Sequence, residues 1–183
     1  EDENFLANPQ NRCYYCKSEL FSRLLEIAAK EGIHFVLDGS NLDDLADFRP
    51  GGMAKKELGV RSPLQEVKMT KAEIRALSQT AGLSTWDKPS LACLSSRIPY
   101  GTRITPEILA QVGGAEAFLR ELGFKQLRVR HHGDLARVEV DVAEIPAAVQ
   151  LKDEIHTHLQ NLGYTYVTLD LKGYRTGSMN EGK

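Results

Sequence analysis

Residues 86–101 read WDKPSLACLSSRIPYG, and the predicted elements of the chain change in kind where this stretch ends. The stretch places Cys93 among hydroxyls, two prolines and the cations Lys88 and Arg97. Nearby positive charge favours the thiolate, which is the nucleophilic form of a cysteine. A free cysteine is also common in an apolar core, but these polar neighbours are not typical of a core. We predict that Cys93 is the reactive residue and that domains 1–100 and 101–183 meet here.

The composition of the chain limits the classes of protein to which it can belong. The chain has 183 residues, 42% of them hydrophobic and 26% charged, and a formal net charge of -2. These values fit a soluble globular protein with one ordinary domain, or an incomplete domain and a smaller complete one. They argue against a generally basic nucleic-acid-binding surface, and leave open only a local patch around residues 128–132. No apolar run approaches the ~20 residues that span a bilayer, and no signal peptide is present, so we predict a cytoplasmic protein.

The first domain is predicted to be α/β with a parallel sheet. Apolar residues at helical spacing predict a helix over residues 18–31, and the apolar run 33–37 that follows is typical of a buried parallel strand. Thr70 and Glu73 form a capping-box pattern, which predicts a helix that runs to Ala81 and ends before Gly82.

The second domain is predicted to be a smaller α+β unit of α-β-β-α-β order. Thr105 and Pro106 predict the start of a helix that reaches Leu122, with a potential break at residues 113–114. Two alternating segments, 124–130 and 136–142, predict a β-hairpin that turns at residues 132–134. A helix over 144–162 and a strand over 164–171 complete the unit.

Polar residues follow the predicted strand 33–37. Asp38, Gly39, Ser40 and Asn41 would lie at the carboxyl end of a parallel strand, where open α/β sheets bind ligands. With Asp44 and its acidic neighbours they could hold Mg²⁺ or a nucleotide. Because any turn uses the same residue types, an ordinary solvated loop is an equally good interpretation.

Two further patterns have both a functional and a structural interpretation. Cys13 and Cys16 have the spacing of half a zinc or iron–sulfur site, but three cysteines in all offer no complete second half, and reduced thiols are the default. Arg128 and Arg130 alternate on a predicted strand, so both would project from one face, as a phosphate or carboxylate clamp requires. Arginines that merely solvate a strand would show the same pattern.

Seven ordered blocks of the chain closely resemble the LarE family. They are NRCYYCK (11–17), DGSN (38–41), DFRPG (47–51), SPL (62–64), the 88–101 loop, RVR (128–130) and GYRTGSMN (173–180). The resemblance covers nearly the whole chain. It implies an enzyme of the PP-loop ATP pyrophosphatase superfamily, a sacrificial sulfur transferase that uses MgATP.

The resemblance also implies a reaction. Members of the family adenylate a carboxylate of pyridinium-3,5-biscarboxylate mononucleotide and release pyrophosphate. A protein cysteine then attacks the acyl adenylate, and cleavage of its Cβ–S bond leaves a thiocarboxylate on the product and dehydroalanine on the protein. The product serves the nickel-pincer cofactor of lactate racemase, so other proteins of that biosynthesis are expected partners, and the family's homo-oligomers are expected here.

Individual residues match family positions. Cys93 matches the sulfur donor, and Arg128 and Arg130 match positions that bind the substrate phosphate or carboxylate. Lys88, Ser96 and Arg97, which lie beside Cys93 in the sequence, are predicted to bind the substrate as well.

Metal and nucleotide roles are also implied. Glu116 resembles an acidic residue implicated in metal contact, and residues 38–41 would lie in the nucleotide half. Some members bind an iron–sulfur cluster through extra cysteines beside the donor. Ala92 and Leu94 flank Cys93 here, which favours the sacrificial type.

One family feature is missing. PP-loop enzymes carry a Ser-Gly-Gly-x-Asp-Ser type loop whose amides grip pyrophosphate, and no Ser-Gly-Gly occurs in this chain. The sequence therefore looks like a member without its first strands and phosphate loop. We expect that the chain by itself neither binds ATP tightly nor transfers sulfur. Calorimetry with MgATP tests this expectation, and micromolar binding would contradict it.

Two alternatives remain at the level of sequence. Another PP-loop enzyme, such as a tRNA thiolase or an amidating synthetase, would share the fold, although a tRNA enzyme should show a basic surface. A binding or assembly module without catalytic activity would explain the missing phosphate loop. Assay of the full-length protein with MgATP and the biscarboxylate nucleotide separates these alternatives.

Overall fold

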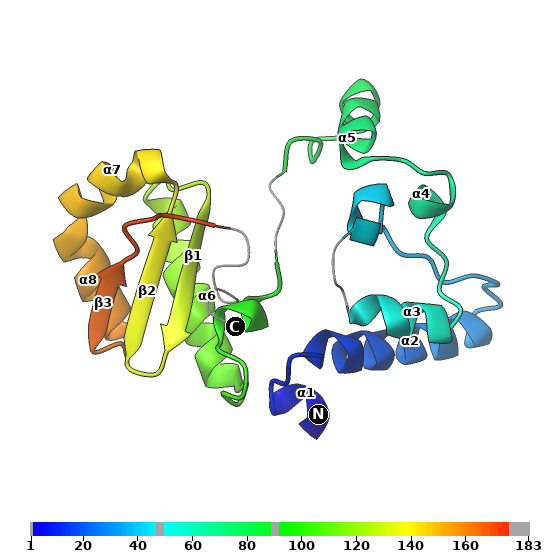
Figure 1. Cartoon of the computed structure of the whole chain (residues 1–183), viewed down its shortest axis with the longest axis horizontal. Coiled ribbons are helices and arrows are strands. Elements are labelled where there is room, and N and C mark those ends of the chain that lie inside the picture. The colour runs from blue at the N-terminus through cyan, green and yellow to red at the C-terminus, as the bar shows by residue number, and fades with distance from the viewer. Residues whose placement is uncertain (1, 47–49, 89–91, 176–183) are drawn as a thin grey trace. The chain divides into compact units, whose positions relative to one another are not determined.

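The computed structural model describes residues 2–46, 50–88 and 92–175, so motif residues 47–49, 89–91 and 176–180 lie outside the described residues. The chain forms two compact units, Glu1–Ser90 and Leu91–Lys183 (Figure 1). The division falls before the predicted boundary at residue 101. The reason is that the short 3-10 helix η2 (Leu94–Arg97) packs against helix α6 and strand β1 of the second unit.

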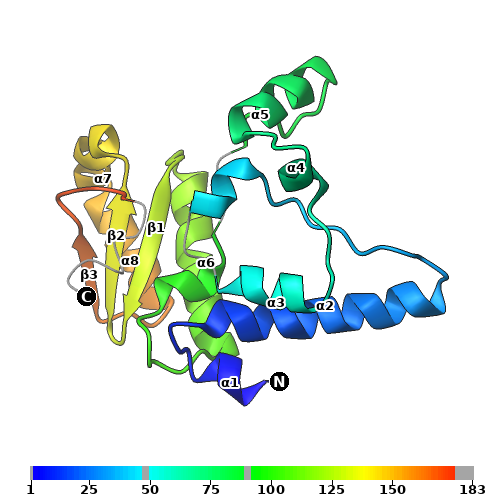
Figure 2. The ribbon, with the colours of Figure 1, turned by 45° about the vertical axis from the view of Figure 1, so that its right-hand side comes forward.

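The first unit is mainly helical. Its elements are α1 (Glu3–Leu6), α2 (Arg12–Lys30), the 3-10 helix η1 (Leu42–Ala46), α3 (Gly51–Glu57), α4 (Pro63–Glu66) and α5 (Lys71–Thr80). Helix α2 packs against α1 and α3 and is the longest element of the unit (Figure 2). It begins at Arg12, earlier than the predicted start at residue 18, so Cys13 and Cys16 lie on its first turns.

The capping box of α5 is confirmed. The Thr70 hydroxyl accepts a hydrogen bond from the Glu73 amide at 3.3 Å, and the Glu73 carboxylate accepts one from the Thr70 amide at 2.8 Å. Two amides that the first turn leaves without a helical partner are thereby satisfied. The helix ends at Thr80, with Ala81 as its C-cap and Gly82 following at positive φ.

The predicted parallel strand over residues 33–37 is wrong. Among the described residues of the first unit, this segment makes only one isolated parallel bridge, between Leu37 and Arg61. Ile33, Phe35 and Leu37 are each more than half exposed, at 56%, 61% and 55%. An apolar run indicates that a segment can be buried in a sheet, but burial also needs neighbouring strands. Within residues 2–46, 50–88 and 92–175, only the segment at Arg61 pairs with this one.

The second unit has the predicted α-β-β-α-β order. Its elements are α6 (Pro106–Glu121), β1 (Leu127–His132), β2 (Leu135–Val140), the 3-10 helix η3 (Val142–Glu144), α7 (Ile145–Gln150), α8 (Lys152–Asn161) and β3 (Tyr166–Leu169). Strands β1 and β2 form the antiparallel hairpin, and β3 pairs with β2 in parallel. The helix predicted over 144–162 is two helices that meet at Leu151.

The sheet separates apolar from polar side chains. Val129 of β1 lies opposite Val138 of β2, and both are buried in the core with Leu119 of α6 and Leu159 of α8. Because successive residues of a strand point to opposite faces, the alternate positions carry charge to the other face. There Arg128 lies opposite Glu139 and Arg130 lies opposite Arg137. The residues between the apolar positions thus supply a polar sheet face.

Helix α6 is continuous through Gly113 and Gly114, so the potential break at these residues does not occur. A Cβ atom at Gly113 would lie 3.3 Å from Leu94 of η2, and one at Gly114 would lie 3.3 Å from Leu162. Both distances are tighter than ordinary contacts. The two glycines therefore serve close packing, and Gly113 lets the segment after Cys93 approach the helix.

Replacing Gly173 by alanine should destabilise the end of the second unit. Gly173 has φ +67°, and a Cβ atom there would lie 2.8 Å from the Val140 carbonyl oxygen. A positive φ alone makes alanine unfavourable by about 1 kcal/mol, and the backbone clash adds to this. The expected result is faster amide exchange at Tyr174, whose N–H donates to Val140 O at 2.7 Å. Gly123→Ala is the matched control, because Gly123 also has a positive φ but a Cβ atom there would meet no atom within 4 Å. Equal rates of amide exchange at Tyr174 in the two variants would contradict the argument.

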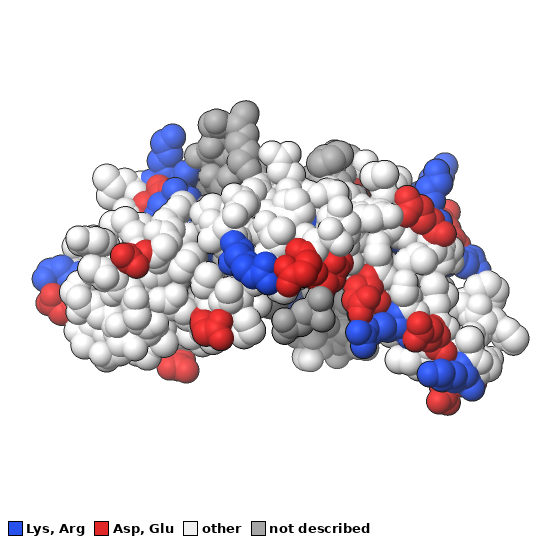
Figure 3. Space-filling view, turned by 90° about the horizontal axis from the view of Figure 1, so that it is seen from below, with Lys and Arg blue, Asp and Glu red and all other residues white. Residues whose placement is uncertain are grey.

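None of the helices described by the structure has both the length and the apolar composition needed to cross a membrane. On the face shown in Figure 3, basic and acidic side chains are interspersed, in keeping with the near balance of 23 basic and 25 acidic residues.

Candidate active site

Cys93 presents its side chain to solvent, while its main chain is held in place. The residue is exposed and is the N-cap of η2, in which its carbonyl oxygen accepts a hydrogen bond from the Ser96 amide at 2.9 Å. The residues that follow are much less accessible: Ser95, Arg97 and Ile98 are all buried. The thiol is therefore carried by a segment that belongs to the packed body of the second unit.

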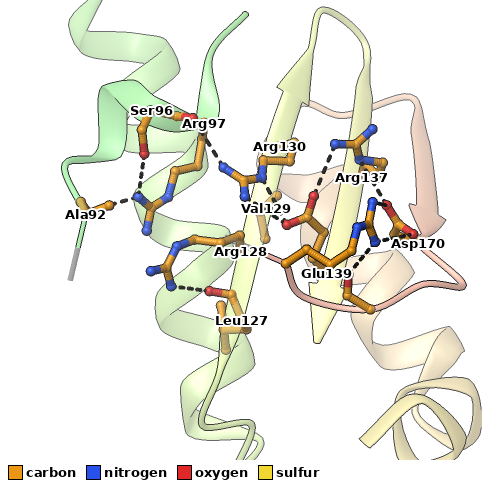
Figure 4. Close-up of polar contacts among 12 residues, drawn as sticks. Ala92, Ser96, Arg97, Leu127, Arg128, Val129, Arg130, Arg137, Glu139 and Asp170 are labelled. Atoms are coloured by element: carbon orange, nitrogen blue, oxygen red, sulfur yellow. Dashed lines mark hydrogen bonds and ion pairs between the residues drawn. The ribbon is translucent and has the colours of Figure 1, made fainter. Parts of the chain in front are cut away.

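Arg97 binds the carbonyl groups before η2. Its Nη1 atom donates to Ala92 O at 2.9 Å and to Ser96 Oγ at 2.9 Å (Figure 4). The same atom donates to Cys93 O at 3.0 Å. The other edge of the guanidinium meets Glu116, with Nε to Oε1 at 2.7 Å and Nη2 to Oε2 at 3.1 Å. Both side chains are only 1% exposed. The sequence predicted that Arg97 supplies charge to the thiol or substrate, but its donors go to Glu116, to the Ser96 hydroxyl and to main-chain carbonyls.

The Glu116 carboxylate accepts hydrogen bonds from several elements at once. Besides the bonds from Arg97, its Oε1 accepts from the Val129 amide at 3.2 Å and its Oε2 from Arg120 at 2.8 Å. Burial by itself raises the pKa of Glu116, but the hydrogen bonds and charge of Arg97, with those from Val129 and Arg120, hold it below its ordinary value of 4.5. This carboxylate is the centre of a buried ion pair, and the metal contact implied for it stays a prediction.

The ionised Glu116 carboxylate should make the stability of the second unit depend on pH. Because the folded pKa of Glu116 lies below the unfolded one, the unfolded state takes up the proton first as the pH falls. The stabilisation is fully present above about pH 4.5 and is lost as the pH falls through the folded pKa. Glu116→Gln should therefore destabilise the second unit at pH 7 and have a smaller effect at pH 3, measured by urea unfolding. An equal effect at both pH values would contradict this.

The polar sheet face joins several charged residues in one network. Glu139 is fully buried; its Oε2 accepts from Arg130 Nη2 at 2.9 Å and its Oε1 from Arg137 Nη2 at 3.1 Å (Figure 4). Arg130 also donates to Ser96 O at 3.2 Å, which ties the sheet to the segment after Cys93. At the far side, Asp170 pairs with Arg137 at 3.7 Å.

Arg128 is a buried arginine of the polar sheet face. It donates to Leu127 O at 2.6 Å, and its guanidinium lies 5.0 Å from the centre of the Tyr174 ring. Burial lowers the pKa of Arg128, and the charges of Arg97 and Arg130 lower it further, against the opposite effects of Tyr174 and Glu116. The binding of a phosphate or carboxylate group by Arg128 stays a prediction.

The predicted alternation of Arg128 and Arg130 on one sheet face agrees with the structure, but the carboxylates of this face, Glu139 and Asp170, were not predicted. Glu139 could have been found, because a hairpin that turns at residues 132–134 places it opposite Arg128. Asp170 and Tyr174 had no local signal. They reach this face through parallel pairing of β3 and the bend after it.

In the first unit, Asp38 is a centre of hydrogen bonds. It accepts from the hydroxyls of Ser40 and Ser62, from the Ser40 amide, and from Lys55, whose Nζ atom lies 3.4 Å from Asp38 Oδ2. Partial burial works against ionisation, but these hydrogen bonds and the Lys55 charge outweigh it and lower the pKa of Asp38. The predicted loop 38–41 is therefore tied to residues 55 and 62, which sequence reasoning had not joined to it.

Neighbouring side chains fix the rest of this loop. The Asn41 amide donates to Asp44 at 2.9 Å, and Gln65 donates to Asn41 O at 3.0 Å. A Cβ atom at Gly39 would meet nothing within 4 Å, so no close approach requires glycine there. The loop is an ordered polar segment in which Asp38 serves to hold Ser40 and Ser62.

The structure does not assemble the remaining predicted residues into a metal site. The described residues contain no group of three or more His, Cys, Asp and Glu side chains that could hold an ion. Cys13 and Cys16 are exposed on α2 of the first unit, whereas Cys93 belongs to the second. Lys88 is exposed at the end of the first unit, where its carbonyl accepts from Arg75 at 3.0 Å.

These features define a class: a mixed α/β protein in which an exposed cysteine lies on a segment that is bound by arginine, next to the polar sheet face.

No family model matches the chain. Three curated proteins are similar to it. An uncharacterized protein of Synechocystis is 52% identical over 180 residues, which are 97% of this chain and 67% of that protein. The pyridinium-3,5-bisthiocarboxylic acid mononucleotide synthase of Lactiplantibacillus plantarum is 46% identical over 98% of this chain and 65% of its own length.

An uncharacterized protein of Methanocaldococcus jannaschii is 30% identical over 95% of the chain and 68% of its own length. The chain thus spans about two thirds of the length of these relatives. It belongs to the LarE family, as its sequence motifs had indicated.

Proposed function

We propose that the protein transfers the sulfur of Cys93 to an adenylated carboxylate of pyridinium-3,5-biscarboxylate mononucleotide, in the biosynthesis of a nickel-pincer cofactor. The observation that carries the proposal is the exposed Cys93 on a segment fixed beside buried arginines. The similarity to a synthase named for the bisthiocarboxylic acid mononucleotide supports it.

The proposed reaction has three balanced steps. The substrate carboxylate attacks the α-phosphorus of ATP, which forms the acyl adenylate and releases pyrophosphate. The Cys93 thiolate then attacks the acyl carbon, forms a thioester and expels AMP. Finally a base removes the Cα proton of Cys93, the Cβ–S bond breaks, and the sulfur leaves with the bonding electrons as the product thiocarboxylate. Dehydroalanine remains at position 93, so each protein molecule donates one sulfur.

The charged sheet face supplies the chemistry for binding such a substrate. The mononucleotide carries a phosphate and carboxylates, and Arg128 lies beside two other guanidinium groups. Arginine binds phosphate and carboxylate groups through charge-assisted, often bidentate hydrogen bonds. In the proposal, Arg128 and Arg130 bind the anionic groups, and Ser96 lies at the junction between them and Cys93.

The first unit is proposed to take part in ATP binding through residues 38–41. The described residues do not provide the ligand set of a resident metal, and the oxygens of Glu116 and Asp38 already accept hydrogen bonds. No step is therefore assigned to a metal held by these residues, and Mg²⁺ enters as part of the substrate MgATP. Cys13 and Cys16 have no role in the proposed steps.

Product analysis tests the proposal. The full-length protein is incubated with MgATP and pyridinium-3,5-biscarboxylate mononucleotide, and the nucleotide is followed by mass spectrometry. We expect a thiocarboxylate product, formed with release of pyrophosphate and limited to one sulfur per protein molecule. Formation of a tRNA thionucleoside or an amide in place of the thiocarboxylate would favour another PP-loop reaction, and no reaction with any of these substrates would favour a binding module.

A further inference from the structure

We infer that Arg97, oriented by Glu116, is a positioning residue that fixes the main chain of Cys93 for sulfur transfer. The chemical meaning of this inference rests on the proposed function, but the contacts themselves do not. They lie entirely within the second unit and connect helix α6 and strand β1 to the donor segment 92–97.

The Arg97 guanidinium donates hydrogen bonds from two of its edges. Its Nε and Nη2 atoms face the Glu116 carboxylate at 2.7 and 3.1 Å, a bidentate geometry that fixes the plane of the group. Its Nη1 atom is thereby directed at Ala92 O and Cys93 O, at 2.9 and 3.0 Å. A planar fork with five N–H donors can make both sets of contacts at once.

Glu116 is itself held by the core. The Val129 amide of β1 and the Arg120 side chain donate to it, and Glu116 is fully buried on α6. The position of the Cys93 carbonyl is therefore defined relative to two rigid elements through one side chain. Arg130 adds a second connection from the sheet, because it donates to Ser96 O.

This arrangement meets a requirement of the proposed reaction. The thiolate must approach an acyl carbon, and afterwards the same residue must present its Cα proton to a base while the Cβ–S bond breaks. Both steps depend on the orientation of the Cα–Cβ bond, which the main chain sets. Fixed geometry of reacting groups contributes substantially to catalysis, and a displacement of about 1 Å can cost ~100-fold in rate.

Arg97→Lys separates positioning from other roles. A lysine keeps the positive charge, but a single ammonium on a flexible stem cannot hold Glu116 and both carbonyls in fixed geometry. Arg120→Gln is the matched control, because Arg120 also pairs with Glu116 but is 43% exposed and makes no contact with the Ala92 or Cys93 carbonyl groups among its described bonds.

Amide hydrogen exchange of the unsubstituted chain and both variants tests the contacts without reference to activity. The Ser96 and Ile98 amides, which donate within η2, report on the donor segment, and the amides of the β1–β2 ladder report on the whole unit. In Arg97→Lys the η2 amides should exchange at least ~10-fold faster relative to the ladder, as a local opening requires. Arg120→Gln should change them much less. Equal acceleration of η2 and the ladder, or none at η2, would overturn the inference.

Single-turnover kinetics of the full-length protein tests the role in the reaction. Conversion of Cys93 to dehydroalanine at saturating substrate should slow roughly 10- to 100-fold in Arg97→Lys, with the dissociation constant of the mononucleotide unchanged. A parallel loss of affinity would identify Arg97 as a substrate-binding residue and overturn the positioning role, as would an unchanged rate. If the unsubstituted protein does not convert Cys93 at all, the proposed function fails, and hydrogen exchange still decides whether Arg97 fixes the segment.

Discussion

Replacing Cys93 by serine should reduce thiocarboxylate formation by the full-length protein to background. Serine retains the size and exposure of the side chain but contains no sulfur, so no product sulfur can come from it. In the proposed reaction adenylation precedes the attack by the thiol, so pyrophosphate release is expected to persist for at least the first turnover. The measurement is the yield of thiocarboxylate per protein molecule by mass spectrometry.

The other two cysteines provide the control for this prediction. Cys13 and Cys16 are exposed on α2 in the first unit and have no step in the proposed reaction. The Cys13→Ser, Cys16→Ser double variant should still form one thiocarboxylate per molecule. Sulfur transfer that survives in Cys93→Ser but is lost in the double variant would assign the donor to α2.

Replacing Glu116 by alanine should lower the free energy of unfolding of the second unit by about 3–5 kcal/mol, the usual effect of breaking a buried ion pair. The change leaves the guanidinium of Arg97, only 1% exposed, without its carboxylate. It also removes the acceptor of the Val129 amide in β1. Exchange of the slowest amides in the β1–β2 ladder measures the loss in this unit specifically.

An exposed ion pair of the same unit serves as the comparison. Lys152 and Asp153 lie 3.0 Å apart with side chains 68% and 91% exposed, so Asp153→Ala should change the stability little. If Glu116→Ala were no more destabilising than Asp153→Ala, the Arg97–Glu116 pair would not hold the donor segment to the core, and the basis of its positioning role would be lost.

Local sequence patterns predicted the second unit well because its elements carry their own signals. Thr105 and Pro106 mark the start of α6, and alternation around the turn at residues 132–134 marks the hairpin. The same alternation placed Arg128 and Arg130 on one face. Gly113 was misleading, since its missing side chain serves packing against Leu94 and not a break in the helix.

Features that depend on distant parts of the chain were predicted less well. The run 33–37 has the composition of a buried strand, yet the described structure gives it one bridge, to Arg61. Arg97 looked like a charge partner of Cys93 because the two are close in sequence. Its actual partner, Glu116, comes from another element, and only the packing of η2 on α6 brings them together. The sequence thus predicted a reactive segment, which stays a prediction, but not the contacts that hold that segment.

The most direct test of sacrificial sulfur transfer is the mass of the Cys93 peptide before and after a single turnover of the full-length protein with MgATP and the mononucleotide. The account predicts that this peptide becomes lighter by hydrogen sulfide, in proportion to the thiocarboxylate formed, while the peptide with Cys13 and Cys16 keeps its mass. Thiocarboxylate formation with an unchanged Cys93 peptide would contradict the account.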